Sequence, residues 1–93
     1  IDSAIPSSFE LSQNYPNPFN PTTNIKFALP NAANIKLTVF NILGQEVANL
    51  VNGYKDAGNY TITWDASKLS SGVYIYRLEA GSNVSTKKLA LMK

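Results

Sequence analysis

The chain has 93 residues, of which 44% are hydrophobic and 11% aromatic, and it contains no cysteine and no histidine. This length suits one domain with a small core, and the aromatic and aliphatic content is too high for a disordered chain. The net charge is +2 and the basic residues are not clustered, so nucleic-acid binding is not expected. No apolar run reaches about 20 residues, so membrane insertion is not expected either.

Residues 1–23 combine several prolines with serine and asparagine. Because the chain begins with Ile1 rather than methionine, we interpret it as part of a longer protein, and residues 1–8 as a linker from a preceding domain. Proline favours extended backbone and lacks an N–H donor, so the stretch that follows is expected along a sheet edge rather than within a central strand. Four apolar side chains are expected to attach it to the domain, with the last of them buried: Phe9, Leu11, Tyr15 and Phe19.

From residue 24 onward, apolar residues alternate with polar ones, which is the pattern of half-buried β-strands. Turn residues separate the runs, among them Asn41 to Gly44, where glycine can adopt a positive φ, and Asn52-Gly53. The expected strands cover residues 24–29, 35–39, 46–51, 60–65 and 73–79, and a last run that follows the turn at 81–83. The pattern predicts an all-β fold for residues 9–93, an immunoglobulin-like antiparallel β-sandwich of about seven strands.

Few side chains could support catalysis. Without histidine and cysteine the chain cannot form the usual serine or cysteine triads or ordinary zinc sites. The six carboxylates are scattered along the sequence, and we expect no enzymatic activity, no metal and no other cofactor. Asp65 could act as a general acid or a calcium ligand, but we favour a role in which it accepts backbone N–H bonds and closes the turn that follows it.

The aromatic residues raise a carbohydrate-binding alternative, because aromatic rings can stack on sugars. The candidates for such a platform are Tyr60, Trp64, Tyr74 and Tyr76. Each of these rings shares a strand face with aliphatic residues, which is typical of core positions. We therefore predict that Trp64 is buried.

Short motifs follow one another in a fixed order from Phe9 to the end of the chain. They are Asn14-Tyr15-Pro16-Asn17-Pro18-Phe19-Asn20-Pro21, Asn41-Ile42-Leu43-Gly44-Gln45-Glu46-Val47, Trp64-Asp65-Ala66, Leu69-Ser70-Ser71-Gly72-Val73-Tyr74 and Lys87-Lys88-Leu89-Ala90-Leu91-Met92-Lys93. In this order they resemble the type A C-terminal sorting domain of the bacterial type IX secretion system, and a related sandwich occurs in the flagellar hook-capping protein. The residues taken as the structural signature are Asn17, Pro18, Phe19, Asn20, Pro21, Gly44, Trp64, Asp65, Gly72 and Tyr74.

The resemblance implies a non-catalytic sorting and translocation domain that follows an N-terminal cargo domain in the same chain. In that family the type IX translocon recognises the domain as the cargo passes from the periplasm across the outer membrane of a Gram-negative bacterium. A sortase-like cysteine protease then cuts upstream of it, here in or before residues 1–8, and the cargo is attached to the cell surface or released. We therefore expect a secreted or surface-exposed protein whose sorting domain is a monomer.

The C-terminal tail is the predicted recognition element. A terminal strand with polar outer positions suits recognition by strand addition or by capture of its terminal carboxylate. The residues expected to take part are Lys87, Lys88, Leu89, Leu91 and Lys93. The alternative functions are a structural accessory module and a carbohydrate-binding module of a larger secreted enzyme.

Overall fold

The computed structural model describes residues 6–92, which form seven β-strands. The strands are β1 (Glu10–Leu11), β2 (Thr22–Leu29), β3 (Ala33–Phe40), β4 (Glu46–Lys55), β5 (Gly58–Asp65), β6 (Gly72–Ala80) and β7 (Asn83–Leu91). Every strand pairing among them is antiparallel. The described residues contain no helix long and apolar enough to cross a membrane.

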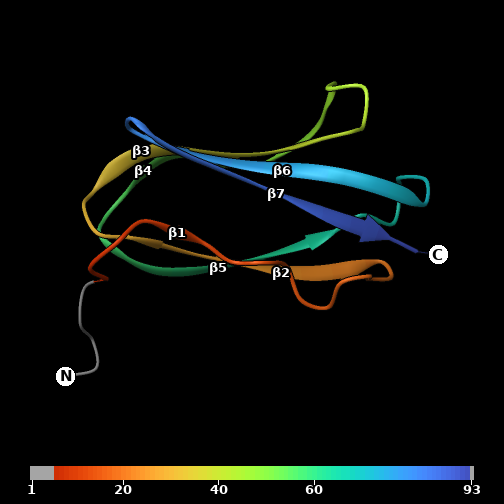
Figure 1. Cartoon of the computed structure of the whole chain (residues 1–93), viewed down its shortest axis with the longest axis horizontal. Coiled ribbons are helices and arrows are strands. Elements are labelled where there is room, and N and C mark those ends of the chain that lie inside the picture. The colour runs from red at the N-terminus through yellow and green to blue at the C-terminus, as the bar shows by residue number, and fades with distance from the viewer. Residues whose placement is uncertain (1–5, 93) are drawn as a thin grey trace.

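The strands form two sheets that face each other as a sandwich (Figure 1). One sheet has three strands in the order β1-β2-β5, and the other has four in the order β4-β3-β6-β7. In immunoglobulin constant domains the fourth strand belongs to the sheet of the first, second and fifth strands. Here it pairs with β3 instead, so that β4 and β7 are the two edges of the larger sheet. The predicted all-β sandwich of about seven strands is confirmed.

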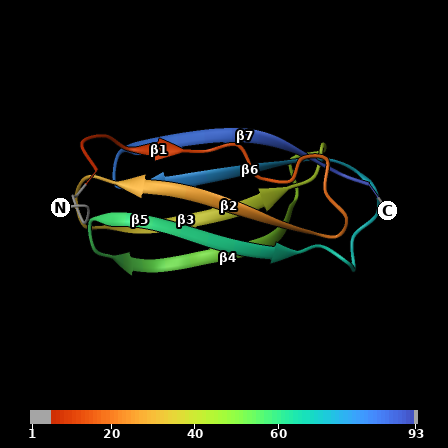
Figure 2. The ribbon, with the colours of Figure 1, turned by 90° about the horizontal axis from the view of Figure 1, so that it is seen from below.

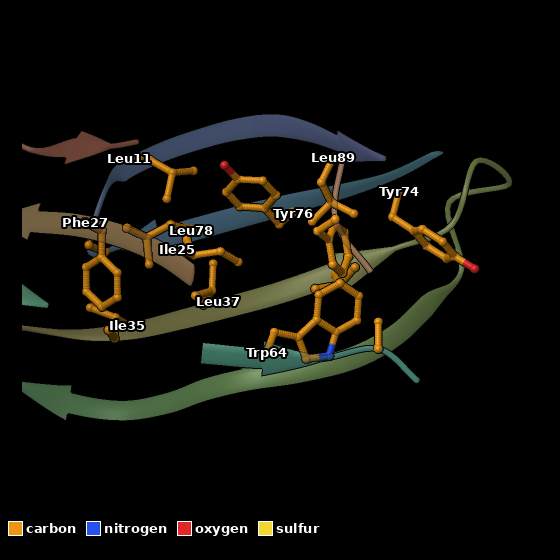
Figure 3. Packing of buried hydrophobic residues seen from close by; sticks show 14 of the residues in the cluster. Leu11, Ile25, Phe27, Ile35, Leu37, Trp64, Tyr74, Tyr76, Leu78 and Leu89 are labelled. Atoms are coloured by element: carbon orange, nitrogen blue, oxygen red, sulfur yellow. The ribbon is translucent and has the colours of Figure 1, made fainter. Parts of the chain in front are cut away.

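The core lies between the sheets and is built from the alternating apolar residues of both inner faces (Figure 3). Its fully buried members include Ile25 of β2, Leu37 of β3 and Leu78 of β6. Trp64 is only 7% exposed, and its ring lies 5.9 Å from that of Phe19, so the prediction of a buried tryptophan is confirmed. Tyr76 is completely buried in the core, so its ring cannot stack on a sugar at the surface.

One strand is longer than the sequence predicted. The expected turn at Asn52-Gly53 is wrong, because β4 continues through these residues to Lys55. Two register shifts in the β3–β4 pairing mark positions where β4 has one residue more than the facing part of β3. Gly53 pairs with Ile35 within the continuous ladder. Asparagine and glycine are frequent turn residues, but a bulged edge strand can also accommodate them.

The segment that precedes β2 is attached to the sandwich as expected, with one exception. Leu11 and Phe19 are buried, and Phe9 packs partly buried against the core. The side chain of Tyr15 is 78% exposed, and Tyr15 attaches the segment only through two backbone hydrogen bonds with Asn24. The role of residues 1–8 as a linker stays a prediction, since residues 1–5 lie outside the described part of the chain.

The molecule is elongated, with a longest dimension of 40 Å. Its first described residues lie at one end of the long axis, and the C-terminal end of β7 lies at the other (Figure 2). The turn between β3 and β4 lies at the same end as the end of β7. We call this the distal end.

Candidate functional site

The predicted recognition residues of β7 do not share one surface. Leu89 and Leu91 are each only 1% exposed and belong to the core. Lys87 lies on the same side of the strand and is half-buried opposite Tyr76, whereas Lys88 is exposed on the outer face of the sheet. The pair Lys87-Lys88 therefore points to opposite sides of the sheet, as neighbouring residues of a strand do. Lys93 lies outside the described residues.

The edge of β7 that does not pair with β6 is covered near its C-terminal end by residues 13–19. The N–H of Phe19 donates to the carbonyl of Ala90 at 3.0 Å, and the N–H of Met92 donates to the carbonyl of Phe19 at 2.9 Å. The side-chain oxygen of Asn17 accepts from the N–H of Ala90 at 3.0 Å. The side-chain amide of Gln13 adds a 2.6 Å bond to the carbonyl of Lys88.

The proline-rich segment therefore protects a sheet edge, as predicted, and the edge is that of the tail itself. A partner strand that added to β7 at residues 88–92 would first have to displace residues 13–19. Within residues 6–92, the outward backbone groups of Val84 and Thr86 have no backbone partner and form the open part of this edge.

A buried polar network attaches the covering segment to the core. The hydroxyl of Tyr76 donates to the carbonyl of Ser12 at 2.7 Å and accepts from the N–H of Asn14 at 2.8 Å. The side chain of Asn14 donates to the hydroxyl of Thr23 and to the carbonyl of Pro16. Burial raises the pKa of Tyr76 to about 12, against the opposing effect of the hydrogen bond from Asn14. The sequence analysis missed this network, although Asn14 opens the first motif.

The signature residues shape turns and close the segment onto the sandwich. Pro21 accepts from the N–H of Ala66, Tyr74 donates its hydroxyl to the carbonyl of Ser70, and Gly44 adopts a φ of 83° in the β3–β4 turn. Gly72 begins β6. Among the signature residues of the proline-rich segment, Asn17, Pro18 and Asn20 are exposed.

Asp65 has the structural role that the sequence favoured. Its carboxylate accepts from the N–H of Ser67 at 2.9 Å, which closes the turn after β5. The described residues contain no group of three or more acidic, histidine or cysteine side chains that could hold a metal ion. The surface hollow beside Asp65 has a volume of about 260 Å³ and is lined mainly by small or aliphatic residues of β4 and of the turn.

The fold and the order of the motifs agree with a sequence family. The profile of the secretion system C-terminal sorting domain matches residues 13–92, which is most of the chain. The chain belongs to this family of sorting domains. The family is non-catalytic, and its members are parts of proteins secreted across the outer membrane of Gram-negative bacteria by the type IX system. Comparison with curated proteins gives no match.

Two solved structures from Porphyromonas gingivalis share the fold of the sorting domain. Dimeric latent PorU matches with a TM-score of 0.66 and 19% identity, over 91% of this chain and 9% of PorU. PorZ, described as an essential surface component of the type IX secretion system, matches with a TM-score of 0.56 and 16% identity, over 94% of this chain and 12% of PorZ. The sorting domain thus corresponds to about a tenth of each of these longer chains.

The outer face of the four-stranded sheet carries residues that the sequence analysis did not select. Across the sorting domain, Phe40, Ile75 and Lys88 lie side by side on β3, β6 and β7. Val73 and Ala90 form the next cross-strand pair toward the distal end. The alternation along β7 therefore offers a partner Lys88 and Ala90, and not Leu89 and Leu91.

Proposed function

We propose that this sorting domain directs a cargo protein through the type IX translocon, and that the translocon recognises the folded domain with its tail strand in place. The match of the sorting-domain family over residues 13–92 carries this proposal. The structure adds a physical reason for a folded signal. Leu89 and Leu91 are core residues, so the last strand cannot be presented alone without opening the sandwich.

The further steps follow from the family. A sortase-like cysteine protease of the same system cuts upstream of the domain, in or before residues 1–8, after which the cargo is attached to the cell surface or released. A cut there leaves the sandwich intact, since the first strand begins at Glu10. The domain itself acts as a monomer and takes no cofactor.

A reporter fusion tests the proposal. Residues 9–93 are placed behind a reporter that has a general export signal, in a bacterium with a type IX system. We expect the reporter at the cell surface or in the medium, and we expect the same fusion without residues 87–93 to remain in the periplasm. Surface delivery of the truncated fusion would contradict the proposal and favour an accessory module.

Truncation also removes core residues, so single substitutions provide the sharper comparison. Lys88→Ala changes an exposed outer position, and Lys87→Ala changes a half-buried position on the opposite side of the same strand. Solvated charges contribute less than about 1 kcal/mol to stability, so Lys88→Ala should fold normally. If Lys88→Ala is folded and exported at the normal rate, Lys88 is not part of the signal.

A further inference from the structure

Partly exposed apolar side chains, together with the exposed Val73, gather at the distal end of the outer face of the four-stranded sheet. One row across the sheet consists of Glu46, Phe40, Ile75 and Lys88, with an acidic residue at one edge and a basic residue at the other. The pair Val73 and Ala90 extends this row distally. We call Phe40, Val73, Ile75 and Ala90 the distal patch.

The rest of the outer face has a different character. Toward the opposite end, the neighbouring cross-strand pairs are Thr38 with Arg77 and Lys36 with Glu79. Arg77 and Glu79 form an ion pair of 3.0 Å, and the guanidinium of Arg77 also covers the ring of Phe40 at 4.6 Å. The continuous apolar row therefore ends at Phe40, and beyond Arg77 the sheet exposes only separate apolar side chains on its two edge strands, Tyr54 on β4 and Val84 on β7.

The turn between β3 and β4 adds two large aliphatic residues to this end. Ile42 is 73% exposed and Leu43 is 78% exposed. Turn positions are usually occupied by polar residues or glycine, so two adjacent exposed aliphatic side chains need a reason. Figure 1 shows this turn rising above the outer face of the four-stranded sheet, on the side away from the smaller sheet.

A local hydrogen-bond network fixes the shape of the turn. The side-chain oxygen of Asn41 accepts from the N–H groups of Leu43 and Gln45, at 2.9 and 3.0 Å. The side-chain amide of Asn41 donates to the side chain of Gln45. The backbone N–H of Asn41 donates to the carbonyl of Gln45, and the N–H of Gly44 donates to the carbonyl of Asn41. Ile42 and Leu43 are thus held in solvent by a defined backbone geometry.

We propose that Ile42 and Leu43, together with the distal patch, dock into a concave apolar surface on a protein of the export machinery. This inference rests on the proposed sorting function and names the surface through which it acts. The tail contributes Lys88 and Ala90 to the contact, so the same surface includes the outward side chains of the last strand. Residue 6 lies at the other end of the 40 Å long axis, so a cargo domain that precedes it would leave this surface open.

The shape and the charges favour a protein partner over the other candidates. The raised turn would hold two copies of the sheet apart if they met face to face, so it fits a hollow better than a second flat face. Glu46 and Lys88 place opposite charges at the two edges of the apolar row. A lipid surface of one charge cannot pair with both, whereas a protein surface with an acidic and a basic group can.

The test uses the reporter fusion described above, with the double substitution Ile42→Ser and Leu43→Ser. Exposed substitutions of this kind change stability by about 0.5 kcal/mol, so the variant should fold normally. We expect surface delivery to fall about tenfold or more, because the proposal makes Ile42 and Leu43 the central anchors of the contact, and tenfold corresponds to a loss of only about 1.4 kcal/mol. A matched control is Tyr54→Ser, which removes an exposed apolar ring from β4 near the opposite end.

A second pair of variants tests the sheet part of the surface. Val73→Thr lies in the distal patch, and Val84→Thr lies on the same outer face outside it. Both positions are exposed, and both changes keep a β-branched side chain. Reduced delivery with Val73→Thr but normal delivery with Val84→Thr is expected, and equal delivery of the two would remove Val73 from the contact.

The outcomes separate this proposal from the sorting function. If the unaltered fusion is not delivered, the sorting function fails. If it is delivered and the Ile42, Leu43 variant is delivered equally well, the sorting function stands and the docking proposal fails. Sedimentation that shows a dimer of the purified domain, lost in the variant, would assign the surface to a second copy. Flotation with phosphatidylethanolamine–phosphatidylglycerol vesicles, lost in the variant, would assign it to the membrane.

Discussion

Tyr76 connects the core to the segment that covers the edge of β7. Its ring lies between the sheets, and its hydroxyl is bonded to two backbone groups of residues 12–14 (Figure 3). Phenylalanine would fill the same space in the core but would leave the carbonyl of Ser12 and the N–H of Asn14 without this partner. A buried group without a partner costs about 1–3 kcal/mol. The hydroxyl therefore matters more for the attachment of the segment than for the packing of the core.

Tyr76→Phe should lower the free energy of unfolding by about 1–3 kcal/mol near neutral pH. The effect should depend on pH, because the pKa of Tyr76 is about 12 in the folded state and 10.0 without burial. Below pH 10 the hydroxyl is protonated in both states and its contribution is complete. Between pH 10 and 12 only the unfolded state loses the proton, so the contribution falls, by up to about 3 kcal/mol.

Urea unfolding of both proteins at several pH values measures this difference. The gap between Tyr76 and its phenylalanine variant should narrow as the pH rises from 10 to 12. A constant gap over that range would mean that the hydroxyl does not titrate differently in the folded and unfolded states. Phe27→Leu is a suitable control, since it changes a buried aromatic ring that has no titratable group.

At the scale of the strands, alternation in the sequence predicted which residues face the core. It placed Leu89, Leu91 and Trp64 on strands and put Trp64 in the interior, because a period of two is a local property of the chain. The same alternation implies that Lys87 and Lys88 point to opposite sides of the sheet, but the sequence analysis grouped both residues in one recognition site. The burial of Leu89 also follows from this alternation, although Leu89 was included among the residues expected to contact a partner.

Other features of the strands depend on which strands become neighbours, and a single sequence does not state this. The prolines indicated that residues 13–21 protect an edge, but only the pairing of Phe19 with Leu91 shows that the edge belongs to β7. The distal patch also depends on the register between β3, β6 and β7. The bulges of β4 explain why Asn52-Gly53 is not a turn.

The coverage of the β7 edge can be tested at a single amide. Asn17→Ala removes the acceptor of the Ala90 N–H, while the Met92 N–H keeps its bond to Phe19. A hydrogen bond contributes about 0.5–1.5 kcal/mol, so exchange of the Ala90 amide should become about 2- to 10-fold faster. Hydrogen exchange followed by NMR measures each amide separately. The amide of Leu89, which pairs with β6, is the internal control and should not change.

The amides of Val84 and Thr86 provide a second comparison on the same strand. They lie on the part of the edge that residues 13–19 do not reach, and they should exchange fast in both proteins. Slow exchange at Ala90 in the Asn17→Ala variant would show that this side chain does not cover the edge in solution.

At the scale of the whole molecule, the docking proposal gives the two ends of the sandwich different tasks, and we call this arrangement the polarity of the domain. The end that carries residue 6 leads to the preceding part of the chain, and the distal end carries the β3–β4 turn and the end of β7 (Figure 2). Because the longest dimension is 40 Å, a bulky cargo that precedes residue 6 would stay away from the distal surface that we propose as the contact.

The polarity predicts opposite results for the same reporter at the two ends. Placed before residue 9, a folded reporter should leave delivery intact. Placed after Lys93, with the export signal still at the N-terminus, it should block delivery, because it would follow the end of β7, which lies at the same end of the molecule as the β3–β4 turn (Figure 2). Tryptophan fluorescence of the domain checks that it remains folded in both fusions, since Trp64 is buried only in the intact sandwich.

A short extension separates this steric effect from loss of the terminal carboxylate. Adding Gly-Ser after Lys93 moves the carboxylate but leaves the distal surface open, so delivery should persist if the outer face is the contact. Loss of delivery with the short extension would instead assign recognition to the carboxylate. Normal delivery of the large C-terminal fusion would contradict the polarity itself, because a contact at the distal end cannot form beneath a folded reporter.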